Sequence, residues 1–489
     1  MSQSTHEAID VLIIGAGISG IGAAYHLSQQ CPHLRFRILE AQDSFGGTWL
    51  THRYPGIRSD TDLYTFGYRF KPWVGPPIAT AEEIIRYLGE VIDENGLAPR
   101  IRYRRRVASA EWSSASKTWT VEANGPDGAE RYEAGFLWMC QGYYDHAKGY
   151  TPEWPGMADF RGQFVHPQTW PDDLDLTGKR VVVIGSGATA ATLVPAIAGK
   201  CAHVTMLQRS PTYFRTGRNA IPIADELRAL KIDESWIHEI VRRKILAESA
   251  KFARRTFEEP EVVTQELLAE VRRRLGPDYD VEKHFTPRYR PWRQRLAFIP
   301  DADLFESIRK GDASVATDEI ERFDAAGVQL KSGERLDADV VVTATGFNLD
   351  AFGKVKMMVD GAPVRLGDTI TLHGVMFTDL PNLAWIFGYF RAGWTLRVDL
   401  VADFVCRLLN HMTERQKRQV SVRLRPEDEG MPIEPWVTED NFNPGYIARG
   451  GHLLPKAGAK PEWRHSHDYW MDKDVLPAID LEAGFFRYE

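Results

Sequence analysis

A strand, a glycine-rich turn and a helix open the chain, and this unit constrains the fold more than any other feature. The apolar run Val11–Ile14 leads into GAGISG at 15–20, and helix-forming residues continue to Gln30. Glu40 stands about 20 residues beyond the turn, at the end of the next expected strand. The glycines let a pyrophosphate approach the backbone, and the acid accepts hydrogen bonds from a ribose. The pattern predicts a Rossmann-like domain that binds a dinucleotide.

The same unit occurs a second time in the middle of the chain. The run Val181–Ile184 precedes GSGATA at 185–190, a variant that ends in alanine. About 20 residues later the next strand ends at Arg209, where the first unit has an acid. An arginine pairs with a 2′-phosphate, which an acid would repel. We therefore predict FAD in the first unit and NADPH in the second, two cofactors that exchange electrons.

Charge and cysteine content narrow the class of protein. The 489 residues include 60 basic and 67 acidic side chains, and a net charge of −7 argues against a nucleic-acid partner. The cysteines are too few for a disulfide scaffold, which favours a reducing compartment. They also lack the close pair that flavin-dependent disulfide reductases need, since they stand at Cys31, Cys140, Cys201 and Cys406.

The apolar stretch Val11–Leu27 is short for a membrane span, and glycines interrupt it. The acids Glu7 and Asp10 precede it, unlike the basic start of a signal peptide. We therefore expect a cytoplasmic protein with no integral membrane segment. No metal site is expected.

We expect an α/β fold with two Rossmann-like dinucleotide-binding domains and a helical insertion, made up of several segments. The expected segments are 1–150 (FAD-binding domain, first part), 151–178 (linker), 179–217 (NADP-binding domain, first part), 218–290 (helical insertion), 291–346 (NADP-binding domain, second part) and 347–489 (FAD-binding domain, second part, with substrate-pocket segments). Within the insertion, the helical stretch Ile237–Leu275 is expected to form a lid over the substrate, with contact to a membrane surface as the alternative. An aromatic cluster could line the pocket or form core: Trp385, Phe387, Tyr389, Phe390 and Trp394.

Two further motifs carry a resemblance to a known family. Residues 160–171 read FRGQFVHPQTWP, which matches FxGxxxHxxxWP, and GGTW at 46–49 continues to YPG at 54–56 and Asp60. Over essentially its whole length the chain resembles the type I Baeyer–Villiger monooxygenases. Within them it is most similar to the branch of the ethionamide-activating monooxygenase, which shares GYYDHAKGY at 142–150 and MLQRSPTY at 206–213.

The resemblance implies an activity. NADPH reduces FAD, dioxygen adds to the reduced flavin, and the flavin peroxide inserts one oxygen atom next to a ketone carbonyl. The product is an ester or lactone, and oxygenation of sulfides or thioamides at sulfur is a side activity. The implied partners are therefore a small ketone or sulfide and dioxygen.

The resemblance also assigns site residues. Arg295 is implied as the cation that stabilises the charged oxygen species, and Asp60 as the acid that holds its guanidinium. Gln294 stands where many relatives carry lysine, which removes one phosphate contact. His166 is interpreted as coupling the two domains. The expected cofactor-binding residues are Gly15, Gly17, Ser19, Gly20, Glu40, Gly47, Thr48, Trp49, Arg58, Ser59, Asp60, Tyr64, Val107, Gly185, Ser186, Gly187, Ala188, Thr189, Ala190, Arg209 and Ser210.

Three alternatives stay open at this point. A flavin monooxygenase that oxygenates nitrogen or sulfur nucleophiles would oxidise amines but not ketones. An NADPH oxidase would release all electrons as hydrogen peroxide and ignore ketones. A non-enzymatic dinucleotide sensor would bind both cofactors without turnover.

Overall fold

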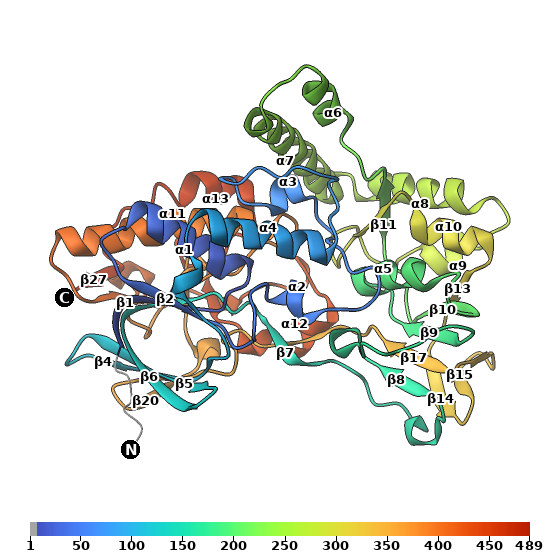
Figure 1. The fold of residues 1–489 in the computed structure, drawn as a ribbon, viewed down its shortest axis with the longest axis horizontal. Coiled ribbons are helices and arrows are strands. Elements are labelled where there is room, and N and C mark those ends of the chain that lie inside the picture. Colours follow the sequence, from blue (N-terminus) through green and yellow to red (C-terminus); the bar gives the residue numbers. More distant parts are fainter. Residues whose placement is uncertain (1–6) are drawn as a thin grey trace.

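The computed structural model describes residues 7–489, and a large mixed sheet forms one half of it (Figure 1). The strand order is β20-β19-β4-β5-β6-β1-β2-β3, with β23 paired to β6. In the centre, β1 runs parallel to both β2 and β6 and its apolar residues are buried on both faces, as typical of parallel strands. The strands are β1 (Glu7–Ile14), β2 (Phe36–Leu39), β3 (Ile101–Arg102), β4 (Arg106–Ser113), β5 (Thr118–Gly125), β6 (Gly128–Met139), β19 (Lys356–Val359), β20 (Ala362–Val364) and β23 (Leu383–Trp385).

A smaller parallel sheet forms the other half, in the order β13-β10-β9-β17-β8. Its strands are β8 (Gln163–Val165), β9 (Arg180–Ile184), β10 (His203–Gln208), β13 (Ala313–Thr317) and β17 (Val340–Thr343). Strand β8 comes from the segment expected to be a linker, and it pairs with β17 from Val340 to Val342. In each sheet one strand, β1 or β9, leads into a glycine turn and a helix. This arrangement confirms the predicted α/β class with two Rossmann-like units.

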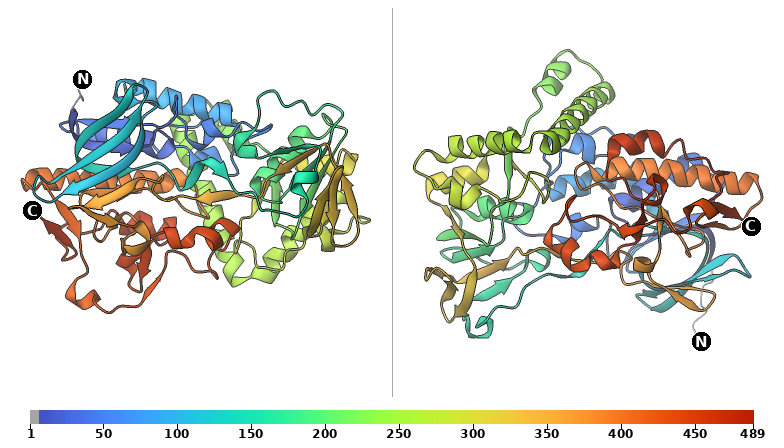
Figure 2. Two further views of the ribbon diagram at one scale, coloured as in Figure 1. Left: turned by 90° about the horizontal axis from the view of Figure 1, so that it is seen from below. Right: turned by 180° about the vertical axis from the view of Figure 1, so that it is seen from behind.

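Both ends of the chain build the first half, and its middle builds the second. In Figure 2 the blue and red segments lie together, with the green and yellow segments beside them. Helices α1 (Ile18–Gln30), α4 (Ala81–Glu94) and α11 (Trp394–Glu414) share one apolar cluster with the first sheet. Helix α11 is continuous from Trp394, and the residues between Trp394 and Asp399 are buried.

The helical insertion connects the two halves. It comprises α6 (Pro222–Ala229), α7 (Glu234–Glu258), α8 (Pro260–Leu275) and α9 (Val281–Phe285). Helix α6 and part of α7 project at the top of Figure 1, whereas Leu268 and Val271 of α8 join the core of the second half. Arg242 of α7 donates hydrogen bonds to the carbonyls of Tyr64 and Gly67 in the first half, at 2.8 and 3.1 Å. None of the helices described between residues 7 and 489 is long and apolar enough to cross a membrane.

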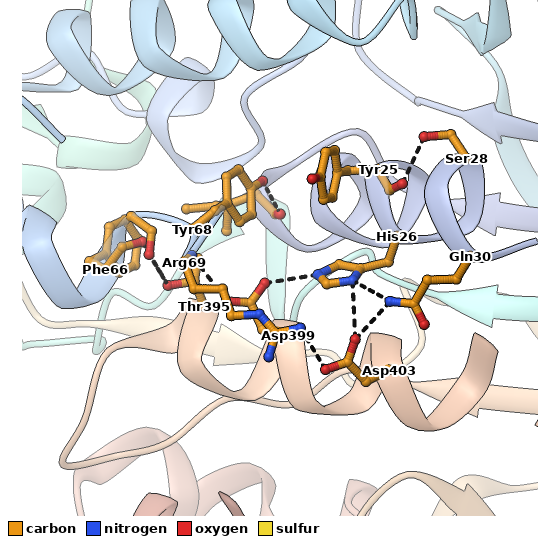
Figure 3. A network of polar contacts seen from close by, with 12 residues as sticks. Tyr25, His26, Ser28, Gln30, Phe66, Tyr68, Arg69, Thr395, Asp399 and Asp403 are labelled. Carbon is orange, nitrogen blue, oxygen red and sulfur yellow. Dashed lines mark hydrogen bonds and ion pairs between the residues drawn. The ribbon is translucent and has the colours of Figure 1, made fainter. Parts of the chain in front are cut away.

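A buried ionic network joins α1 to α11 (Figure 3). His26 Nε2 lies 2.9 Å from Asp399 Oδ1, and His26 Nδ1 lies 3.4 Å from Asp403 Oδ1. Arg69 donates to Asp403 at 2.6 Å and Gln30 donates to it at 2.8 Å. Burial lowers the pKa of His26, but the hydrogen bonds to Asp399 and Asp403 outweigh burial and raise it above 6.5. The network therefore favours a protonated His26.

Replacing His26 with glutamine is expected to cost more stability in acid than in alkali. Because the folded-state pKa of His26 is raised, its ionic contribution is complete below 6.5 and is lost as pH rises through the raised pKa. The pKa of Asp403 is lowered to about 2, so its contribution persists down to that range. We expect a loss of about 2 kcal/mol near pH ~5.5 and a smaller loss near pH ~9, measured by urea unfolding. An equal loss at both pH values would contradict a charged His26.

Candidate functional site

A cleft of about 700 Å³ draws its walls from both halves of the molecule. Both glycine turns, the GGTW segment and the strand end at Arg209 open into it. Most predicted site residues line the cleft, namely Gly15, Gly17, Ser19, Glu40, Gly47, Thr48, Trp49, Arg58, Asp60, Val107, Gly185, Ser186, Gly187, Ala188, Thr189, Arg209, Ser210 and Arg295. Gly20, Ser59, Tyr64 and Ala190 lie outside its lining. The structure thus gathers residues that are far apart in the sequence into one cleft.

The first glycine turn presents a fixed carboxylate and a free helix terminus. Glu40 is 5 % exposed, and its carboxylate accepts the N–H groups of Ala16 and Gln42 at 2.7 and 2.8 Å. Gly17 is the N-cap of α1 and makes no side-chain cap, so the first N–H groups of the helix stay available for a pyrophosphate. A Cβ atom on Gly47 would lie 3.3 Å from the Cα of Gly17, so the GGTW segment lies close against the first glycine turn.

The second turn is open in front of its helix. Gly187 is the uncapped N-terminus of α5 (Ala188–Ile197), and a Cβ atom there would meet nothing within 4 Å. In contrast, a Cβ atom on Gly185 would lie 2.3 Å from the carbonyl oxygen of Ala344. Gly185 therefore serves packing, and the space beside Gly187 fits a phosphate group at a helix N-terminus. Arg209 and Ser210 are exposed at the rim of the same cleft.

Arg295 and Asp60 form an ion pair in the wall of the cleft. Arg295 Nε donates to Asp60 Oδ2 at 2.6 Å, and Nη2 lies 2.5 Å from the same oxygen. Burial lowers the pKa of Arg295, but Asp60 and three neighbouring tyrosines more than reverse this and raise it above its ordinary value. The Arg295 side chain is 37 % exposed, and it lines the cleft. A permanent, oriented positive charge thus borders the cleft.

The neighbouring arginines point elsewhere. Arg290 donates to the carbonyls of Pro291 and Asp440, and Arg293 donates to the Asp440 carboxylate at 3.3 Å. Neither side chain lines the cleft. Arg295 lines the cleft and Arg290 and Arg293 do not, so the geometry favours Arg295 as the functional residue.

Tyr64 and His166, two residues singled out from the sequence, do not line the cleft. Tyr64 is 1 % exposed, its hydroxyl donates to the Gly75 carbonyl at 3.2 Å, and its ring stacks on His238. His166 lies between the segments that cross from one half to the other. Its Nε2 is 3.3 Å from the Gly346 carbonyl, and its ring packs so closely on Gly149 that a Cβ atom there would lie 1.9 Å away. These contacts suit a positioning role for His166.

The aromatic cluster divides between core and cleft. Tyr389 and Trp394 line the cleft, whereas Trp385, Phe387 and Phe390 are buried in an apolar cluster. The cleft residues that sequence reasoning missed include Tyr143, Tyr144 and Tyr446. The shared GYYDHAKGY segment contains the first two, but no spacing pattern links them to Tyr446.

Comparisons with known proteins agree with this architecture. The NAD(P)-binding Rossmann-like domain matches residues 13–74, and the flavin-binding monooxygenase-like family matches residues 74–223. The FAD-containing monooxygenase EthA of Mycolicibacterium smegmatis is 44% identical over 98% of this chain and 97% of its own. A probable FAD-binding monooxygenase AlmA of an Acinetobacter species is 44% identical over 99% of this chain and 96% of its own.

Solved structures share the fold. An oxidised steroid monooxygenase bound to NADP matches with a TM-score of 0.71 at 24% identity, covering 86% of this chain and 88% of its own. A cyclohexanone monooxygenase matches with a TM-score of 0.70 at 22% identity, covering 86% and 91%. With two dinucleotide turns at one cleft and relatives that match along its length, the chain belongs to the flavin-binding monooxygenase-like family, in the branch of EthA and AlmA, and uses FAD and NADP.

Proposed function

We propose that this enzyme inserts one oxygen atom of dioxygen next to a ketone carbonyl and releases an ester or lactone. In the balanced reaction, ketone, dioxygen, NADPH and a proton give ester, NADP⁺ and water. Oxygenation of sulfides or thioamides at sulfur is the proposed side activity. The observation that carries this proposal is the Arg295–Asp60 ion pair, which lies in the cleft shared by both dinucleotide turns.

The protein's part in this reaction is to bind, orient and stabilise charge. The first glycine turn and Glu40 would hold FAD, which would supply the redox chemistry with NADPH and dioxygen. Asp60 engages Nε and Nη2 of Arg295 and so fixes the plane of the guanidinium. A fixed cation beside the reacting oxygens stabilises the negative charge that develops on them.

The cleft wall favours apolar substrates. Aromatic side chains line the cleft that holds the ion pair, among them Trp49, Phe66, Tyr143, Tyr144, Tyr389, Trp394 and Tyr446. Such a lining binds hydrocarbon groups and excludes water from the reacting atoms.

A substrate panel tests the proposal. Linear, cyclic and aryl ketones are incubated with the enzyme and NADPH, and ester, hydrogen peroxide and NADPH consumption are measured. We expect NADPH oxidation that a ketone stimulates and that ester formation matches. Oxidation of sulfides and amines without any ester would favour the alternative monooxygenase, and hydrogen peroxide as the sole product would favour an oxidase.

Replacing Arg209 with alanine is expected to weaken the preference for NADPH. A charged hydrogen bond to the 2′-phosphate would be lost, so we expect the KM for NADPH to rise about tenfold and the KM for NADH to stay nearly constant. Steady-state kinetics with both cofactors measure this. Arg322, exposed on β14 (Ile320–Asp324) away from the cleft, is the control position. An equal rise for NADH would contradict a phosphate contact.

A further inference from the structure

Three tyrosines from distant parts of the chain meet in one wall of the cleft. Tyr143 and Tyr144 lie at the start of β7 (Tyr144–Gly149), and Tyr446 lies on α12 (Gly445–Gly450). The hydroxyls of Tyr143 and Tyr144 are 2.6 Å apart. The ring of Tyr446 stands edge-on to Tyr144, with 5.4 Å between the ring centroids. All three line the cleft together with Arg295.

The three phenols differ in how their hydroxyls are used. The hydroxyls of Tyr143 and Tyr144 are hydrogen-bonded to each other. The ring of Tyr143 packs on Trp394 with 5.3 Å between the ring centroids, and the ring of Tyr144 packs on Phe347 with 4.5 Å between them. The hydroxyl of Tyr446 is buried. It interacts with the hydroxyls of Tyr143 and Tyr144 but forms no hydrogen bond of good geometry with any described residue. A buried hydroxyl whose partners are poorly aligned gains when a polar group in the cleft accepts a hydrogen bond from it.

The three tyrosines interact electrostatically with the Arg295–Asp60 ion pair. Burial raises the pKa values of all three phenols above their ordinary range, so they stay protonated and can donate. The positive charge of Arg295 acts in the opposite direction to burial on the pKa of each phenol. Arg449 anchors the short helix that carries Tyr446, since it donates to the Phe347 carbonyl at 3.1 Å and covers the Tyr150 ring at 3.4 Å.

We propose that Tyr446 donates a hydrogen bond to the carbonyl oxygen of the substrate, with Tyr143 and Tyr144 as positioning residues. This inference rests on the proposed ketone oxidation and adds a residue that sets specificity. When a nucleophile adds to a ketone, the carbonyl oxygen becomes negative, and a donor in place stabilises it. A sulfide that takes up oxygen develops no such oxyanion from a carbonyl. Tyr446 therefore favours ketones over sulfides.

Replacing Tyr446 with phenylalanine tests this, because it removes the hydroxyl and keeps the ring. We expect kcat/KM for a ketone to fall about 100-fold and kcat/KM for a sulfide to change less than about twofold. Tyr144→Phe is expected to lower the ketone-to-sulfide ratio in the same direction by a smaller factor. Tyr469→Phe on α13 (Tyr469–Val475), a tyrosine outside the cleft, is the matched control and should leave both rates unchanged. FAD content checks that each variant is folded.

The outcomes separate this inference from the function on which it rests. If the wild-type enzyme forms ester and Tyr446→Phe keeps the ketone rate, or loses ketone and sulfide rates equally, the role of Tyr446 is overturned and the proposed function stands. If the wild-type enzyme forms no ester from any ketone while it oxidises sulfides, both are overturned.

Discussion

The Arg295→Ala variant is expected to reduce its flavin with NADPH yet form no measurable ester. The substitution removes the positive charge beside the reacting oxygens and leaves the Asp60 carboxylate without its 2.6 Å partner. Removal of one such stabilising group costs about 100- to 1000-fold in rate, and the unpaired carboxylate adds to the loss. We therefore expect ester formation to fall at least about 1000-fold. Anaerobic bleaching of the flavin by NADPH and product analysis in air measure the two steps separately.

A neighbouring arginine provides the control. Arg293 belongs to the same segment, lies outside the cleft lining and pairs with Asp440, whose side chain is 98 % exposed. Arg293→Ala should keep most ester formation. An Arg295→Ala enzyme that forms ester at the wild-type rate would remove Arg295 from the reaction.

The second large effect is expected at the first glycine turn. A Cβ atom on Gly20 would lie 1.9 Å from the carbonyl oxygen of Gly15, and since that oxygen is backbone, no side-chain movement relieves the clash. We expect Gly20→Ala to lose about 3 kcal/mol of folding stability and most of its FAD, because α1 must move away from β1. Thermal unfolding and the absorbance ratio of flavin to protein measure both effects.

The second turn offers a contrasting substitution. At Gly187 the backbone φ is −77° and a Cβ atom meets nothing within 4 Å, so alanine fits the folded chain. Gly187→Ala should keep stability and FAD content but raise the KM for NADPH, since the methyl group enters the space where a phosphate would approach. Gly20→Ala with wild-type FAD content would contradict the packing argument.

Local patterns made much of the fold predictable. The apolar run Val181–Ile184 lies within β9, as predicted, because a buried apolar run followed by a glycine turn leaves few alternatives. Both glycine turns follow a predicted strand and begin a helix, as expected from their spacing. Gly20 also has a physical reason, since a Cβ atom there would lie 1.9 Å from the Gly15 carbonyl oxygen.

Features that depend on distant contacts were not predictable from the sequence. The three residues of β8 gain their strand character from pairing with β17, and their own composition resembles a connector. The resemblance to a family, and no local pattern, separated Arg295 from its neighbours. The meeting of Tyr144 with Tyr446 depends on how the C-terminal segment folds back over the cleft. Tyr64 was expected near the flavin, and its packing on His238 depends on the inserted helix α7.

The central claim is that the cleft delivers one oxygen atom of dioxygen to a ketone. Mass spectrometry of the product formed under isotopically labelled dioxygen, with NADPH and a responsive ketone, tests it most directly. We predict one labelled atom in the ester or lactone, with the second recovered in water. Ketone recovered unchanged, with all the label in hydrogen peroxide, would contradict the account.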